Sequence, residues 1–165
     1  MHMTRVIIRE PSPLEPPPEE LPNFPLYSQD DPHWCWAACA RMVLAHYSGG
    51  TSVLTQCDIA SKFFGINCAG NEYCQQALEC ECVPDLYDRL GRTAKRQDPG
   101  TLNIGTATRV INRESPIQAL INEIHYILIV GVTANHTYIV RDPDPDHPMS
   151  EIGGDQVDGP WWIIA

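Results

Sequence analysis

Residues 126–132 constrain the fold of this chain more than any other segment. They read Tyr-Ile-Leu-Ile-Val-Gly-Val, an apolar run without the alternation of a strand that has one side in water. The run therefore predicts a β-strand covered on both faces. Its neighbour 116–121 could be helix or strand on pattern alone, and we interpret it as a strand because a short turn would then pair the two segments. Residues 137–141 and 161–164 are predicted as further strands, separated by a Pro- and Asp-rich loop at 142–160.

The first half of the chain has a helical pattern instead. An Ala-rich segment that begins at Cys35 predicts a buried helix, which the glycine pair 49–50 ends. A second helix is predicted over 55–64, opened by a threonine N-cap with an aspartate three residues on. Shorter helices are expected at 84–90 and 106–112. Helices followed by antiparallel strands indicate an α+β fold.

The chain is acidic, with a formal net charge of −10 over 165 residues. Nucleic-acid binding needs a basic stripe, and docking on anionic lipid needs basic patches, so neither partner is expected. No apolar run approaches the roughly 18 residues of a membrane-spanning helix. We interpret the acidity as a source of solubility and expect a monomer.

The N-terminal segment 1–25 differs in composition from the rest. Seven of the fifteen prolines lie within 10–25. Proline fixes φ and lacks a backbone donor, so this stretch should be extended, as a linker or as an arm across the protein. Residues 26–165 are predicted to form a single domain.

Cys35 is the candidate nucleophile, because it stands at the predicted start of the Ala-rich helix. A cysteine reacts as its thiolate, which the partial positive charge of a helix N-terminus favours. Gln29 lies six residues upstream, where a loop could bring its side-chain amide beside the backbone N–H of Cys35 as two donors to an oxyanion. On its own such a cysteine is usually a small buried residue, so the assignment depends on the histidine and aspartate that follow.

His125 is the candidate base among several histidines. It opens the strand that follows it, and its ring can point toward the helix N-terminus. His46 lies three helical turns, about 16 Å, beyond Cys35 and is too far away. His136 is expected in a solvent-facing turn.

Asp142 ends a predicted strand, where a carboxylate can hold one ring nitrogen of a histidine so that the other faces sulfur. Asp144 is the alternative. His33 and Trp34 are candidates for lining a substrate groove, whereas Trp36 is expected in the core.

Three segments carry a resemblance to a known family. They are Gln-x5-Cys-Trp-Ala-Ala at 29–38, Thr-Gln-Cys-Asp-Ile-Ala at 55–60, and the stretch from His-Tyr-Ile-Leu-Ile-Val-Gly to Ile-Val-Arg-Asp-Pro at 125–143. Together they resemble the papain-like cysteine peptidases, closest to the compact bacterial branch of C39-like and AvrRpt2-type proteases.

The resemblance implies Cys35 as nucleophile, His125 as general base and acid, Asp142 as orienter and Gln29 as oxyanion donor. It also implies a papain-like fold, in which the nucleophile helix and its neighbours pack against a C-terminal antiparallel sheet. The activity implied is hydrolysis of a peptide or amide bond through an acyl-enzyme, with a peptide or protein substrate and without a metal or organic cofactor.

Two alternative functions remain open at this stage. The same triad would serve acyl transfer or deamidation of a transglutaminase-like kind. A catalytically silent groove that only binds peptides is the other alternative, although a complete set of Cys, His, Asp and Gln argues against it.

Six of the seven cysteines remain once Cys35 is reserved as a free thiol. This density favours disulfides and an oxidising compartment, hence a secreted, extracytoplasmic or translocated protein over a cytoplasmic one. We predict at least one bridge within 57–82. Reduced packing thiols and a zinc site are the alternatives, and the spacing lacks the close Cys pairs that structural zinc prefers.

Overall fold

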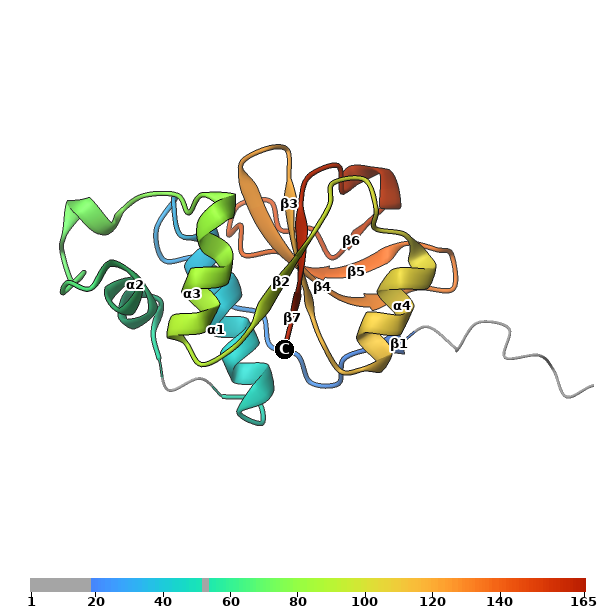
Figure 1. Cartoon of the computed structure of the whole chain (residues 1–165), viewed down its shortest axis with the longest axis horizontal. Helices are drawn as coiled ribbons and strands as arrows, with labels where there is room; N and C mark the ends of the chain where they lie inside the picture. The colour runs from blue at the N-terminus through green and yellow to red at the C-terminus, as the bar shows by residue number, and fades with distance from the viewer. Residues whose placement is uncertain (1–18, 52–53) are drawn as a thin grey trace, which may run out of the picture.

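The computed structural model describes residues 19–51 and 54–165, and these form one antiparallel sheet with helices on both faces (Figure 1). The strand order is β2-β7-β3-β4-β5-β6, with β1 beside β4. The strands are β1 Glu19–Glu20, β2 Ala94–Gln97, β3 Ile117–Ile121, β4 His125–Val132, β5 Tyr138–Arg141, β6 Glu151–Ile152 and β7 Trp161–Ile164. The α-helices are α1 Cys35–Tyr47, α2 Gln56–Phe64, α3 Val83–Arg89 and α4 Ile104–Asn112, and short 3-10 helices span Glu72–Cys74, Cys80–Cys82 and Gly154–Gln156.

Strand β4 is covered on both faces, as its apolar run predicts. Tyr126, Leu128 and Val130 belong to the core that the sheet shares with α1, α2 and α3. Ile127 and Ile129 belong to a second core on the other face, under α4. Figure 1 shows the same division, with the first three helices on one side of the sheet and α4 on the other. Burial of each such side chain contributes roughly 1.5–3 kcal/mol to the stability of the fold. The predicted α+β fold, with N-terminal helices packed against the sheet, is confirmed.

Local sequence signals explain where most helices begin and end. Helix α2 has the predicted capping box between Thr55 and Asp58, and it ends at Gly65 in the left-handed region with φ 70°. Helix α4 begins two residues before its predicted start, because the side chain of Asn103 accepts a hydrogen bond from the backbone N–H of Thr106 and caps the helix there.

Three strands have no counterpart in the sequence analysis. Strand β2 reads Ala-Lys-Arg-Gln and β6 has only two residues, so neither carries an apolar alternation. Strand β1 lies inside the Pro-rich segment, and the backbone N–H of Leu21 continues its pairing by donating to the carbonyl of Val130 at 2.8 Å. Leu21 and Phe24 are both buried in the core. The packed part of the described chain therefore begins before Leu26, while 1–18 lie outside the described residues.

A disulfide joins Cys68 to Cys74, which confirms the expectation of at least one bridge within 57–82. The bridge takes both sulfurs away from the zinc site considered as an alternative. The same segment is held against the start of α1, since the indole N–H of Trp34 donates to the carbonyl of Cys74 at 2.8 Å and that of Trp36 donates to the carbonyl of Gln76 at 2.9 Å. Trp36 is fully buried, as expected.

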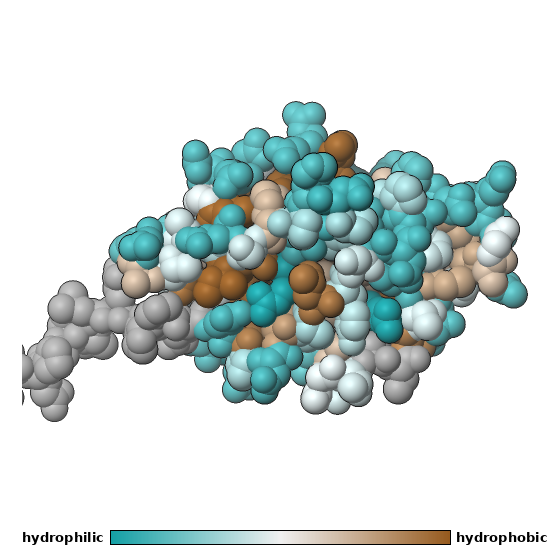
Figure 2. Space-filling model, turned by 180° about the vertical axis from the view of Figure 1, so that it is seen from behind, coloured by the Kyte–Doolittle hydropathy of each residue, from teal (hydrophilic) through white to brown (hydrophobic). Residues whose placement is uncertain are grey.

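The surface is mainly polar on the face that Figure 2 shows, where hydrophobic side chains gather only in small patches. Large apolar side chains that remain exposed in the described chain are few: Leu26, Ile66, Tyr73 and Ile124. None of the helices within 19–51 and 54–165 has the length and apolar character needed to cross a bilayer.

Removal of the disulfide should destabilise the protein without unfolding it. The bridge closes a short loop, with a sequence separation of 6, for which loop entropy gives about 2 kcal/mol. A Cys68→Ser/Cys74→Ser variant should therefore melt roughly 4–8 °C below wild type in calorimetry.

Cys57→Ser is the matched control, because Cys57 is a half-buried thiol outside the bridge. Alkylation of the unfolded, unreduced protein should modify five of the seven cysteines. Modification of all seven, or equal melting temperatures for the double variant and the control, would contradict the bridge.

Candidate active site

Cys35 is the first residue of α1 and lines the larger of two adjoining pockets. Its sulfur-bearing side chain is almost fully buried, at 6% exposure. The first N–H groups of a helix have no acceptor within the helix, so the backbone around Cys35 presents donors and the positive end of the helix dipole. The pocket has a volume of about 630 Å³ and also contacts His125 and Asp142.

His125 and Asp142 meet because of the sheet register. His125 is the first residue of β4, and Asp142 directly follows the last residue of β5. These strands are antiparallel, with Leu128 paired to Arg141, so the start of β4 and the end of β5 lie at one edge. There Nε2 of His125 and Oδ1 of Asp142 are 2.6 Å apart.

Asp142 is held as a carboxylate by three donors. It is 2% exposed, and burial alone would raise its pKa. The hydrogen bond from His125 and the backbone N–H groups of Met149 and Asp144, at 2.9 and 3.0 Å, outweigh that effect and lower the pKa below its ordinary value. The result is a buried negative charge aimed at the histidine.

The pKa of His125 is raised from 6.5 to about 10. Burial alone would lower it, but hydrogen bonds to Asp142 and Cys35, and the charges of both groups, favour the imidazolium more strongly. Because Nε2 faces Asp142, Nδ1 is the ring nitrogen left for the sulfur of Cys35. A histidine that stays protonated beside a thiol is the arrangement that stabilises a thiolate.

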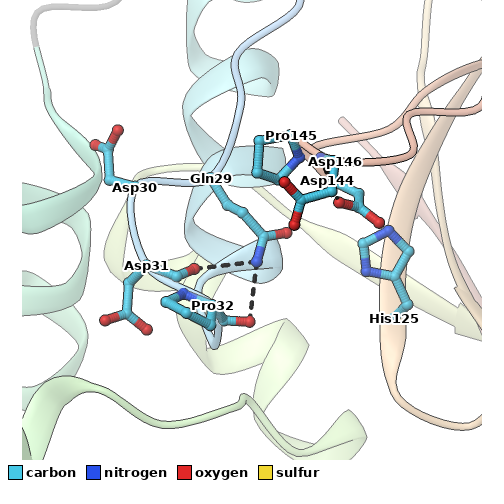
Figure 3. Close-up of a pocket in the computed structure, with 8 residues that line it drawn as sticks. All are labelled: Gln29, Asp30, Asp31, Pro32, His125, Asp144, Pro145 and Asp146. Atoms are coloured by element: carbon cyan, nitrogen blue, oxygen red, sulfur yellow. Dashed lines mark hydrogen bonds between the residues drawn. The ribbon is translucent and has the colours of Figure 1, made fainter.

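Gln29 lines the second pocket, of about 430 Å³, across which it faces His125 (Figure 3). Its Nε2 donates to the backbone carbonyls of Asp31 and Pro32 at 3.0 and 2.9 Å. Its Oε1 is buried and has no hydrogen-bond partner. Gln29 thus stands beside the site, but in this conformation its amide nitrogen is turned toward its own loop.

The remaining predicted residues differ in position. His33 lines the larger pocket, and its side chain is 58% exposed. Trp34 is 7% exposed and is part of the core. Asp144 borders both pockets, but its Oδ1 accepts the backbone N–H groups of Asp146 and His147 and so orders its own loop.

The histidines set aside in the sequence analysis lie elsewhere. The ring of His46 contacts the carbonyl of Glu114 through Nε2 at 3.1 Å and packs on Phe24. His136 occupies the turn between β4 and β5 with a positive φ of 62°. Neither ring lines the pocket that holds Cys35.

Some residues around the site were not anticipated from the sequence. Ile124 and Met149 line the larger pocket, and Ile124 is 79% exposed. Gln56, the first residue of α2, is fully buried and bonded to the loop that carries Gln29. A glutamine in the first turn of a helix gives no sign of burial, and only its place in the 55–60 motif singled it out.

Within the described ranges, no three or more His, Cys, Asp or Glu side chains are grouped so that they could hold a metal ion.

Comparison with known proteins gave one family. The model of the Peptidase_C39 like family matches residues 21–152, a range that includes Gln29, Cys35, His125 and Asp142. The match confirms the resemblance to C39-like peptidases. No curated protein matches the chain.

Removal of the charge at Asp142 should alter how Cys35 responds to pH. Asp142→Asn keeps a side chain of the same shape but removes the carboxylate that raises the pKa of His125. The imidazolium is then lost at lower pH, and alkylation of Cys35 by iodoacetamide at neutral pH should slow roughly tenfold or more. The rate should instead rise with pH, because the imidazolium that favours the thiolate is no longer present at neutral pH.

Asp144→Asn is the matched control, since it removes a charge from the same loop without touching the bond to His125. Its alkylation profile should follow that of wild type. An Asp142→Asn profile that also follows wild type would show that Asp142 does not govern the histidine.

Proposed function

Because this chain belongs to the Peptidase_C39 like family, we propose that it is a cysteine peptidase that hydrolyses a peptide or amide bond through Cys35, His125 and Asp142. The observation that carries the proposal is the place of one histidine between a thiol and a buried carboxylate. His125 lines the same pocket as Cys35, which stands at the start of a helix, and its Nε2 lies 2.6 Å from Oδ1 of the buried Asp142. That is the order of nucleophile, base and orienter that thiol catalysis needs.

In the proposed acylation step, the thiolate of Cys35 attacks the substrate carbonyl carbon. The carbonyl oxygen becomes an oxyanion, to which the backbone N–H of Cys35 donates a hydrogen bond. His125, protonated at Nδ1, then gives its proton to the leaving amine, and the C–N bond breaks. Asp142 keeps the ring oriented throughout and stabilises its positive charge.

In the proposed deacylation step, the now neutral His125 takes a proton from water. The resulting hydroxide attacks the thioester carbonyl, the C–S bond breaks, and the sulfur leaves as the thiolate beside the now protonated His125, which restores the starting pair. The larger pocket would hold the substrate next to the sulfur. Its mixed wall, with His33 and the apolar side chains of Ile124 and Met149, suits an extended peptide more than a small charged ligand.

Gln29 is proposed as the second oxyanion donor, after a rotation of its side chain. The amide nitrogen must release at least one of its bonds to Asp31 and Pro32. Its buried Oε1 has no partner, and an unmade bond of this kind costs about 1–3 kcal/mol. That cost disfavours the present orientation of the Gln29 side chain and so lowers the free energy needed to rotate its amide toward the oxyanion.

Replacement of the nucleophile or of the base should abolish peptide cleavage. The measurement is digestion of a peptide library by each variant, with the products identified by mass spectrometry. Cys35→Ala removes the attacking atom, and His125→Ala removes both the proton carrier and the charge that holds the thiolate. Each should reduce turnover to below roughly a thousandth of wild type. Neither change should unfold the protein, because both side chains border a pocket.

His136→Asn is the matched control, since asparagine tolerates the positive φ at this turn. It should cleave the same peptides as wild type. Full turnover by Cys35→Ala would refute the proposal, and loss in His136→Asn with survival in His125→Ala would show that another histidine is the base. Release of free carboxylate products distinguishes hydrolysis from acyl transfer.

A further inference from the structure

Gln56 is a fully buried amide that serves a segment remote from it in sequence. It is the first residue of α2 and has 0% exposure. A buried amide must be hydrogen-bonded to be tolerated, and both of its ends are. Its Oε1 accepts the backbone N–H of Asp30 at 2.8 Å, and its Nε2 donates to the carbonyl of Ser28 at 2.7 Å.

These two bonds enclose Gln29, the residue between Ser28 and Asp30. The backbone of Gln29 has a third tie, because its N–H donates to the carbonyl of Pro143 at 2.8 Å. Pro143 directly follows Asp142. The Gln29 backbone is therefore held on one side by α2 and on the other by the loop that starts with the carboxylate of the active site.

The base of this arrangement is itself rigid. Thr55 and Asp58 form a reciprocal capping box at the start of α2, with bonds of 2.9 and 3.1 Å. The capping box fixes the first turn of the helix, which is where Gln56 sits. Ile59 and Ala60, one turn further, are buried in the core and anchor the helix.

We infer that Gln56 is a positioning residue, which holds the 28–30 backbone so that the side chain of Gln29 can reach the oxyanion. This inference rests on the proposed function. Gln56 touches none of the reacting groups and acts through Gln29. Donor placement matters because a displacement of about 1 Å can lower a rate on the order of 10²-fold.

The test starts from Gln56→Met, which keeps the volume of the side chain and removes both bonds. With a peptide substrate, kcat should fall on the order of 10²-fold and KM should change little, since the bonds made to the bound substrate are unaffected. Alkylation of Cys35 by iodoacetamide should keep its wild-type rate. That reaction displaces iodide from a saturated carbon and forms no oxyanion, so it reports only the thiolate and its histidine.

A double-mutant cycle separates positioning from general damage. Gln29→Ala should lower kcat by roughly 10²–10³, the usual loss for one oxyanion donor. If Gln56 acts through Gln29, the double variant Gln29→Ala/Gln56→Met should be no slower than Gln29→Ala alone. Multiplying effects, or a fall in alkylation rate that matches the fall in kcat, would overturn the inference.

Gln118→Met is the matched control. Gln118 is also fully buried, and its Oε1 accepts the hydroxyl of Tyr87 from the core side of the sheet, away from residues 28–30. This variant also replaces a buried, hydrogen-bonded amide in the core and should keep the wild-type kcat. A comparable loss of kcat in Gln118→Met would mean that destabilisation explains the effect, and the inference would fail.

Amide hydrogen exchange tests independently of activity whether the two hydrogen bonds of Gln56 hold the 28–30 backbone, an arrangement we call the clamp. Gln56→Met should speed exchange at the N–H groups of Asp30 and Gln29, while the N–H of Met149, bonded to Asp142, should stay protected. Unchanged exchange at Asp30 would overturn the clamp itself. A different pair of results separates the two claims. If Gln56→Met speeds exchange at Asp30 but Cys35→Ala keeps full turnover, the proposed function is refuted and the clamp is still supported.

Discussion

The hydrogen bond between His125 and Asp142 connects the sheet to the candidate active site. It joins the first residue of β4 to the residue after β5, so it forms only when these two antiparallel strands pair in the observed register. A shift by one residue would turn the histidine to the other face of the sheet. The buried carboxylate also needs its two backbone donors, which the loop after β5 supplies.

The rest of the fold places the sulfur against this pair. Helix α1 packs on the sheet face formed by Tyr126, Leu128 and Val130, which brings the helix N-terminus to the edge where His125 begins. The two tryptophans that flank Cys35 donate to the carbonyls of the disulfide-linked segment 74–76. A short covalent loop and two buried indoles thus fix the first turn of α1, which carries the thiol.

Much of this could be predicted from the sequence, because the signals are local. The apolar run of β4, the Ala-rich start of α1 and the capping box of α2 each specify an element from neighbouring residues. Cys35, His125 and Asp142 lie at the ends of such elements, and ends that face a common edge could be matched. The helix ends that shifted did so by a residue or two, as with the Asn103 cap of α4.

The features that escaped prediction depend on contacts between distant segments. Strand β1 forms only because β4 extends past β3 and leaves a place beside Val130 and its neighbours. The buried amide of Gln56 is explained by a loop some 26 residues away, and the orientation of Gln29 by carbonyls of its own turn. No periodicity or spacing encodes such bonds.

The charge on His125 tests the account most directly. Nuclear magnetic resonance of the ring nitrogens reports whether one or both carry a proton. At about pH 8 an ordinary histidine, with a pKa near 6.5, is neutral. The account predicts that His125 is doubly protonated at that pH, because Asp142 and Cys35 raise its pKa to about 10. A neutral ring with a single N–H would contradict it.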